Sequence, residues 1–180
     1  IKSHFNFLMN NIIASKLTAY NELIANFNNL QLITVSHYSR ATIKYYLPER
    51  NVEPYVCYSP IKLFNYYNGN VLPEELKSKF NISEYRYFLF CNAKRVRKNN
   101  SIALLAFDKF LSKAGRQDLK AVVLGSSERY EKYILKKIKN ISNFIFSSYV
   151  ERDEFEALYK FAHLFVFPSI LEGFGYPPIE

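Results

Sequence analysis

Short apolar runs alternate with longer amphipathic segments from residue 85 to the end of the chain. Each apolar run has the length of a strand buried on both faces, and the intervening segments show helical periodicity. The predicted strands are Tyr85–Cys91, Leu119–Leu124, Phe144–Phe146 and Leu164–Phe167. The predicted helices are Ser101–Lys113, Glu128–Lys139, Glu151–Ala162 and one that begins at Pro177. Gly115 ends the first of them. Because strands separated by helices form parallel sheets, this pattern predicts an α/β fold with a doubly wound parallel sheet.

The pattern is less regular before residue 85. Apolar residues at helical spacing over 5–30 predict one amphipathic helix. It could lie on a membrane surface, but its polar face carries few cations, which favours packing on a protein core. A strand at Gln31–Ser36 precedes a helix that Ser36 or Ser39 caps and that ends at Leu47. The remaining predicted elements are a strand at Tyr55–Tyr58, a loop over Pro60–Asn70 and a short helix opened by Pro73.

The formal net charge of +8 favours an anionic partner: a nucleic acid, a phosphate or an anionic membrane surface. No apolar run is long enough for a transmembrane helix, and the first residues lack the layout of a signal peptide. Since the first residue is not Met, we interpret the chain as a piece of a longer protein. Cys57 and Cys91 lack metal-ligand spacing, which predicts buried, reduced thiols in a cytoplasmic protein.

Ligands of open parallel sheets bind at the carboxyl ends of the strands, which directs attention to three loops. They are Asn92–Asn99, Gly125–Ser127 and Pro168–Tyr176. The last contains Gly173 and Gly175 before a predicted helix, an arrangement that could aim backbone N–H groups at an anion. On spacing alone, an ordinary strand-to-helix turn is the slightly favoured interpretation.

The segment from Pro168 to Glu180, PSILEGFGYPPIE, resembles the signature of family 4 retaining glycosyltransferases of the GT-B fold. That signature has two glutamates separated by seven residues, and Glu172 and Glu180 match both. The resemblance implies that Glu172 faces the donor sugar and that Glu180 binds the ribose hydroxyls. It also implies that the backbone around Gly173, Phe174 and Gly175 faces the sugar and the diphosphate.

The basic loop Asn92–Asn99 fits the same family. Fixed cations there would stabilise the charge that a departing nucleoside diphosphate gains. In the family this loop supplies an Arg or Lys, and then a Lys followed by Asn; Lys98-Asn99 matches the second part. For the first cation the sequence offers Arg95, with Lys94 as the alternative. Without the glutamate motif, this loop would be interpreted as a solvated basic turn.

Weaker similarities extend the resemblance over most of residues 31–180. Gly125 resembles the family's strand-to-glycine turn, near which the donor nucleotide passes, although a structural role is the default interpretation of this glycine. Tyr149 and Val150 resemble the segment whose backbone contacts the base. The resemblance implies that residues 1–50 end an N-terminal acceptor domain and that residues 51–180 form an incomplete, Rossmann-like donor domain.

Together these features predict a retaining enzyme that moves a hexose from a UDP- or GDP-sugar to a saccharide or lipid-linked acceptor. Arg95, Lys98 and Glu172 are the predicted catalytic residues, and no metal or other cofactor is expected. The enzyme would serve polysaccharide biosynthesis in the cytoplasm. Peripheral association with the membrane would place it at the inner face. The chain by itself is expected to lack activity. One alternative is a non-catalytic nucleotide-sugar-binding fragment; another, a basic nucleic-acid-binding domain, is disfavoured because it gives Glu172 and Glu180 no role.

Overall fold

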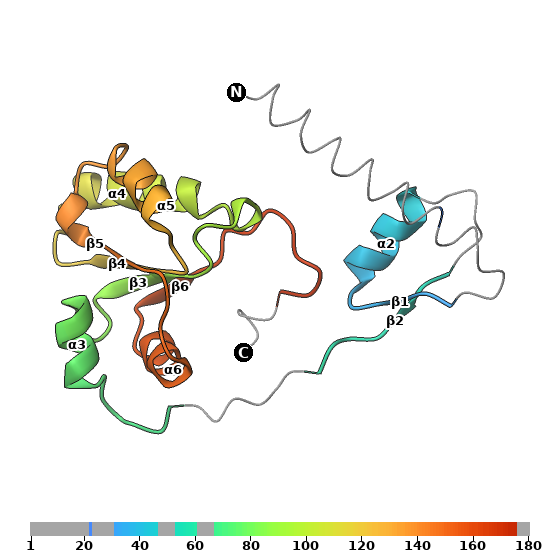
Figure 1. Cartoon of the computed structure of the whole chain (residues 1–180), viewed down its shortest axis with the longest axis horizontal. Coiled ribbons are helices and arrows are strands. Elements are labelled where there is room, and N and C mark those ends of the chain that lie inside the picture. The colour runs from blue at the N-terminus through green and yellow to red at the C-terminus, as the bar shows by residue number, and fades with distance from the viewer. Residues whose placement is uncertain (1–21, 23–30, 47–52, 61–66, 176–180) are drawn as a thin grey trace. The chain divides into compact units, whose positions relative to one another are not determined.

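The computed structural model describes residue 22 and residues 31–46, 53–60 and 67–175 (Figure 1). The chain divides into two compact units, Ile1–Pro60 and Ile61–Glu180. The helix predicted over 5–30, apart from residue 22, and the helix predicted from Pro177 lie outside the described residues. The two units are therefore described separately.

The first unit contains a two-stranded parallel sheet whose two strands are connected by a helix. Strand β1 (Ile33–Thr34) pairs with β2 (Tyr55–Val56), and α2 (His37–Tyr46) lies between them in sequence. The Ser39 amide donates to Ser36 Oγ at 3.1 Å, so Ser36 caps the helix. The sequence placed β2 in a domain starting at residue 51, whereas β2 pairs with β1 inside the first unit.

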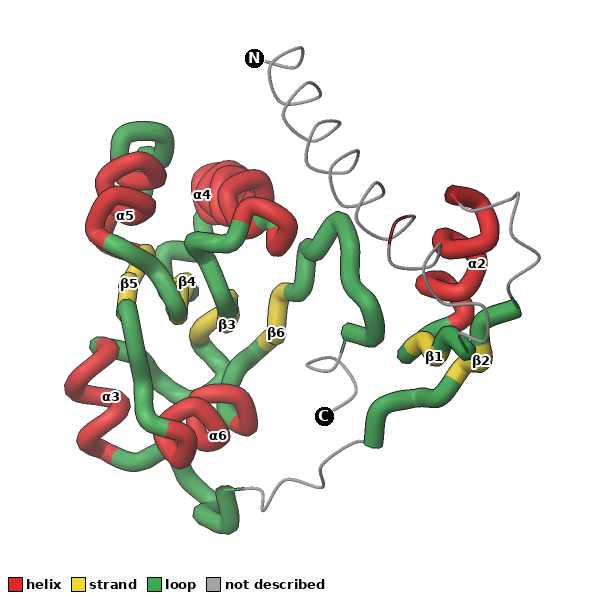
Figure 2. Tube along the Cα trace, turned by 45° about the vertical axis from the view of Figure 1, so that its right-hand side comes forward, coloured by secondary structure: helices red, strands yellow, loops and turns green. Residues whose placement is uncertain are grey.

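The second unit is built on a four-stranded sheet of order β5-β4-β3-β6, with every pair parallel (Figure 2). The strands are β3 (Tyr87–Phe90), β4 (Lys120–Leu124), β5 (Phe144–Ser147) and β6 (Leu164–Val166). All four lie at the positions that the apolar runs predict. Most residues of β3 and β4 are buried, as expected for strands covered on both faces.

Helices cover both faces of this sheet, which confirms the predicted doubly wound, Rossmann-like α/β fold. On one face α3 (Glu74–Phe80) and α6 (Arg152–Lys160) pack against Leu89 and Val122. On the other face α4 (Asn100–Ala114) and α5 (Glu128–Leu135) pack against Phe90 and Val123 (Figure 1). Two short 3-10 turns, η1 (Val96–Lys98) and η2 (Ile141–Asn143), complete the unit.

Local sequence signals set most helix ends. Gly115 follows α4 with φ 63°, the left-handed conformation that ends a helix. α5 ends at Leu135 instead of the predicted Lys139. The reason is non-local: the backbone amides of Lys139 and Asn140 donate to Oδ1 of Asp108 on α4 at 3.0 and 2.9 Å. Those amides are therefore withdrawn from continuing the helix.

The order of the strands positions the site. The chain moves from β3 to β4 to β5 in one direction and then returns to place β6 on the other side of β3. This reversal is the topological switch point, where a crevice opens between loops that leave in opposite directions. The two loops that leave β3 and β6 are the basic loop, 91–99, and the glutamate loop, 167–175.

Candidate functional site

Lys98 and Glu172 meet at the switch point. Lys98 Nζ donates to Glu172 Oε1 at 2.6 Å, although the two residues are 74 positions apart in sequence. Lys98 is only 7% exposed, and its ammonium lies 4.7 Å from the ring centroid of Phe167. The structure thus brings together one residue from each of two of the three loops that the sequence singled out.

The backbone around Lys98 is held at several points. The 3-10 turn η1 ends at Asn99, which adopts a left-handed conformation at φ 55° and redirects the chain into α4. Next to it, the buried Asn100 side chain donates from Nδ2 to the Cys91 carbonyl at 2.8 Å, tying the start of α4 to the end of β3. The Ile170 amide donates to the Arg97 carbonyl at 3.0 Å, which joins the two loops.

Arg97 is a second cation at Glu172. Its Nη1 lies 3.8 Å from Glu172 Oε2, while Lys98 takes the other carboxylate oxygen. Lys94 and Arg95, the cations that the sequence favoured, are exposed, and neither forms an ion pair with a residue that the structure describes. Arg97, Asn100 and Phe167 are thus site residues that sequence reasoning did not select. The signal for Arg97 was its position directly before Lys98.

The charges of this cluster favour an ionised Glu172. Burial alone would raise the pKa of its carboxyl, but the hydrogen bond from Lys98 and the charges of Lys98 and Arg97 outweigh burial and lower it. Glu172 therefore carries its negative charge at neutral pH. The cluster of Lys98, Arg97 and Glu172 combines two cations with one anion, and Lys98 is its most buried member.

Glycine occurs at positions 175 and 125 for two different physical reasons. Gly175 has φ 81°, which a side-chain-bearing residue rarely adopts, so the glutamate loop requires glycine there. Gly125 has φ 69°, and a Cβ on it would lie 3.2 Å from the Asn92 Cα. Gly125 thus allows close packing between the ends of β4 and β3. Gly173 is exposed, Phe174 is half-buried, and Glu180 lies outside the described residues.

Tyr149 and Val150 lie at the same edge of the sheet but after β5, which β4 separates from β3. The Tyr149 hydroxyl donates to Glu151 Oε2 at 3.2 Å, and its ring is 68% exposed. Val150 packs against the core formed with α3 and α6. The structure places these residues on the side of the carboxyl edge away from the Lys98–Glu172 pair.

The two thiols have different environments, and the prediction that both are buried is wrong for Cys57, which is exposed. Burial at the end of β3 raises the pKa of the Cys91 thiol to about 12, an effect that the nearby Lys98 charge only partly offsets. At pH 8 only about 10⁻⁴ of Cys91 is then thiolate, the form that reacts.

We expect an alkylating reagent at pH 8 to modify Cys57 quickly and Cys91 only after unfolding, because the Cys91 thiol is both protonated and partly covered. Mass spectrometry of the native and urea-unfolded chain would count the modified thiols. The Cys57→Ser variant provides the control, since its native form should remain unmodified. Equal modification rates for the two cysteines in the native chain would contradict the structure.

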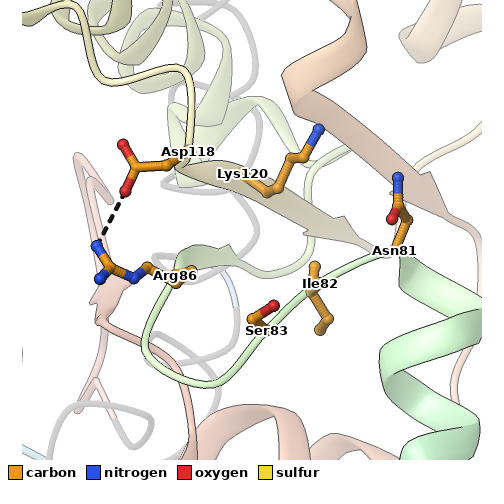
Figure 3. A pocket seen from close by; sticks show the side chains of 6 residues that line it. All are labelled: Asn81, Ile82, Ser83, Arg86, Asp118 and Lys120. Carbon is orange, nitrogen blue, oxygen red and sulfur yellow. Dashed lines mark hydrogen bonds and ion pairs between the residues drawn. The ribbon is translucent and has the colours of Figure 1, made fainter.

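The cavity of about 500 Å³ shown in Figure 3 lies at the opposite, amino edge of the sheet. It is lined by Asn81, Ile82, Ser83, Arg86, Asp118 and Lys120. Its cations are already engaged: Arg86 Nη1 lies 2.9 Å from Asp118 Oδ2, and Lys120 Nζ donates to the Ser142 carbonyl at 2.8 Å. The cavity is therefore separate from the switch-point site, and both of its cations already have hydrogen-bond partners in the chain.

Membrane-spanning helices and metal clusters are both missing from the part of the chain that the structure describes. No helix there combines the length and apolar character needed to cross a membrane. No three His, Cys, Asp or Glu side chains there lie together in a group that could hold a metal ion. A metal-independent reaction stays a prediction.

The chain is similar in sequence to known proteins. Three Escherichia coli sequences, each described as serotype-specific mannosyltransferase WbdA, are 51% identical to it over 39 residues. The match covers 22% of this chain and 5% of each relative, so the chain corresponds to a small part of those proteins. Residues 73–180, which include the whole four-stranded sheet and both loops of the site, match the family described as glycosyl transferases group 1. With this family match and the α/β fold that carries it, the chain belongs to the group 1 glycosyltransferases.

Proposed function

We propose that this chain forms the donor side of a retaining hexosyltransferase that uses a nucleoside-diphosphate sugar. The observation that carries the proposal is the Lys98–Glu172 pair at the switch point of a group 1 glycosyltransferase domain. An open parallel sheet binds its ligand at this point. The buried ammonium of Lys98 and the exposed guanidinium of Arg97 fit a diphosphate, and the carboxylate fits sugar hydroxyls.

In this proposal each charged group has one task. When the bond between the sugar and the diphosphate breaks, the departing diphosphate gains negative charge, and Lys98 stabilises that charge from a fixed position. Arg97 lies where it adds a second positive charge, and Lys94 and Arg95 are exposed cations of the same loop. Backbone amides around Gly173, Phe174 and Gly175 add hydrogen bonds. Glu172 orients the sugar, and Glu180 binds the ribose.

The substrates follow partly from the relatives. Because the matching Escherichia coli proteins are described as mannosyltransferases, mannose is the first hexose to test. Both UDP and GDP remain candidates for the nucleotide, with Gly125, Tyr149 and Val150 as the segments proposed to lie along it. A saccharide or lipid-linked glycan is the proposed acceptor. The net charge of +8 supports peripheral association with an anionic membrane surface, where a lipid-linked acceptor would be found.

Calorimetric titration of the 180-residue chain with UDP, GDP, UDP-glucose and GDP-mannose tests this proposal. We expect one molecule of a nucleotide to bind per chain. The Lys98→Ala variant should bind that nucleotide more weakly, because it lacks the ammonium group that contacts the diphosphate in this proposal. The failure of all four compounds to bind, together with salt-sensitive binding of single-stranded nucleic acid, would refute the proposal. Binding without sugar transfer by the complete enzyme would favour a non-catalytic nucleotide-sugar-binding module.

A further inference from the structure

Both carboxylate oxygens of Glu172 lie beside cations of the chain. Its Oε1 accepts from Lys98 Nζ at 2.6 Å, and its Oε2 lies 3.8 Å from Arg97 Nη1. One anionic group thus bridges two cations, with one oxygen directed to each. Two oxygens of a phosphate group would bind the same pair of cations in the same way.

We propose that Glu172 is an internal substitute for the donor diphosphate, holding Lys98 and Arg97 in the nucleotide-free chain and releasing them when a diphosphate binds. The inference rests on the function proposed above and adds a second role for Glu172. In its first role the carboxylate contacts the sugar. In its second role it competes with the nucleotide for the same two cations.

The burial of Lys98 explains why a substitute is needed. Lys98 is 7% exposed, and a buried ammonium group without an anionic partner is strongly destabilising. Among the acidic residues that the structure describes, Glu172 alone forms an ion pair with Lys98 or Arg97. Without nucleotide, Glu172 therefore supplies the anion that keeps Lys98 charged and in place.

The glutamate loop permits the exchange. Glu172 lies between Ile170 and Gly173 in a segment without regular secondary structure. The Ile170 amide, bound to the Arg97 carbonyl at 3.0 Å, fixes the loop against its neighbour. The Glu172 side chain, which is 20% exposed, extends from this fixed backbone and can rotate away from Lys98 without disturbing the core.

This competition discriminates between donor and product. A nucleoside diphosphate must displace Glu172 from Lys98 and offers the carboxylate no new partner. A nucleotide sugar displaces it in the same way but presents sugar hydroxyls that Glu172 accepts hydrogen bonds from. The exchange therefore weakens the binding of the spent nucleotide more than that of the donor. Return of Glu172 to Lys98 after transfer promotes release of the nucleoside diphosphate.

The Glu172→Gln variant tests the inference, because it keeps the shape of the side chain and removes the competing charge. Titration of the 180-residue chain with UDP and GDP should show binding about tenfold tighter than wild type, equal to about 1.4 kcal/mol. The matching nucleotide sugar should gain less or lose affinity, since a neutral amide then replaces the charged acceptor of its hydroxyls. Glu74→Gln, which changes the net charge equally at a side chain 85% exposed, should leave both affinities at the wild-type value.

The gain should disappear when Glu172→Gln is combined with Lys98→Ala, because the ammonium for which the two anions compete is then absent. Thermal unfolding of each variant establishes that it is folded, and Glu172→Ala repeats the test with a shorter side chain. If wild type binds a nucleoside diphosphate and neither Glu172 variant binds it more tightly, the substitute role is wrong while the proposed function stands. If no variant binds any nucleotide, both are overturned.

Discussion

Replacing Phe107 by alanine is expected to lower the free energy of unfolding by about 3–5 kcal/mol. Phe107 lies on α4 and is 5% exposed. Its ring packs against Phe90 of β3 and Phe144 of β5, with centroid distances of 6.2 and 5.7 Å. Truncation leaves a cavity between the helix and two strands, and a sheet whose strands are covered on both faces cannot collapse to fill it.

Urea denaturation of the 180-residue chain, monitored by circular dichroism, would measure this loss. Phe110 provides a matched control. Like Phe107, it lies on α4 and its ring contacts that of Phe88, but Phe110 is 40% exposed. Phe110→Ala is expected to cost about 1 kcal/mol or less, since a partly solvated ring leaves no closed cavity. Equal losses for the two variants would show that α4 does not face the sheet as described.

The same burial pattern explains why much of this fold was predictable from sequence. β3 to β6 were located because a strand covered on both faces must be apolar at every position, and such runs stand out from amphipathic helices. The end of α4 was predicted from Gly115, whose left-handed conformation is a local property. These signals are contained in short stretches of sequence.

The features that sequence reasoning missed depend on contacts between distant residues. The early end of α5 follows from Asp108, which accepts hydrogen bonds from amides 31 and 32 residues later. The pairing of β2 with β1 joins residues 22 apart, and no local pattern says which strand is the partner. Strand order has the same character, because apolar runs do not show that β6 returns beside β3.

The site shows a similar division. Glu172 and Lys98 were each predicted from a motif in its own loop, but their 2.6 Å contact depends on the return of β6 to β3. The motif match selected Arg95 as the first cation, with Lys94 as the alternative, and did not consider which cation besides Lys98 lies beside Glu172. In the structure that cation is Arg97, whose position depends on the 3-10 turn over Val96–Lys98 and on the left-handed Asn99. The sequence therefore predicts a positively charged loop, whereas the folded backbone determines which of its cations reaches Glu172.

Replacing Lys98 by alanine is expected to remove about 2–4 kcal/mol of transition-state stabilisation, a decrease of about 30-fold to 10³-fold in the rate of sugar transfer. The reason follows from the proposed role of Lys98. Its charge is held in place by the backbone of η1, the pairing with Glu172 and the ring of Phe167. A cation that needs no rearrangement during the reaction stabilises the departing diphosphate more than a solvated one does.

The measurement is hexose transfer from GDP-mannose and UDP-glucose by the protein at its full natural length. Because the proposed role places Lys98 where charge develops on the leaving group, kcat should fall more than the KM for the donor rises. Lys98→Met separates charge from side-chain length and should be similarly slow. Lys109→Ala, which removes an exposed cation on α4, should transfer sugar at the wild-type rate. Wild-type turnover by both Lys98 variants would assign the leaving-group charge to other cations of the loop, Arg97 first among them.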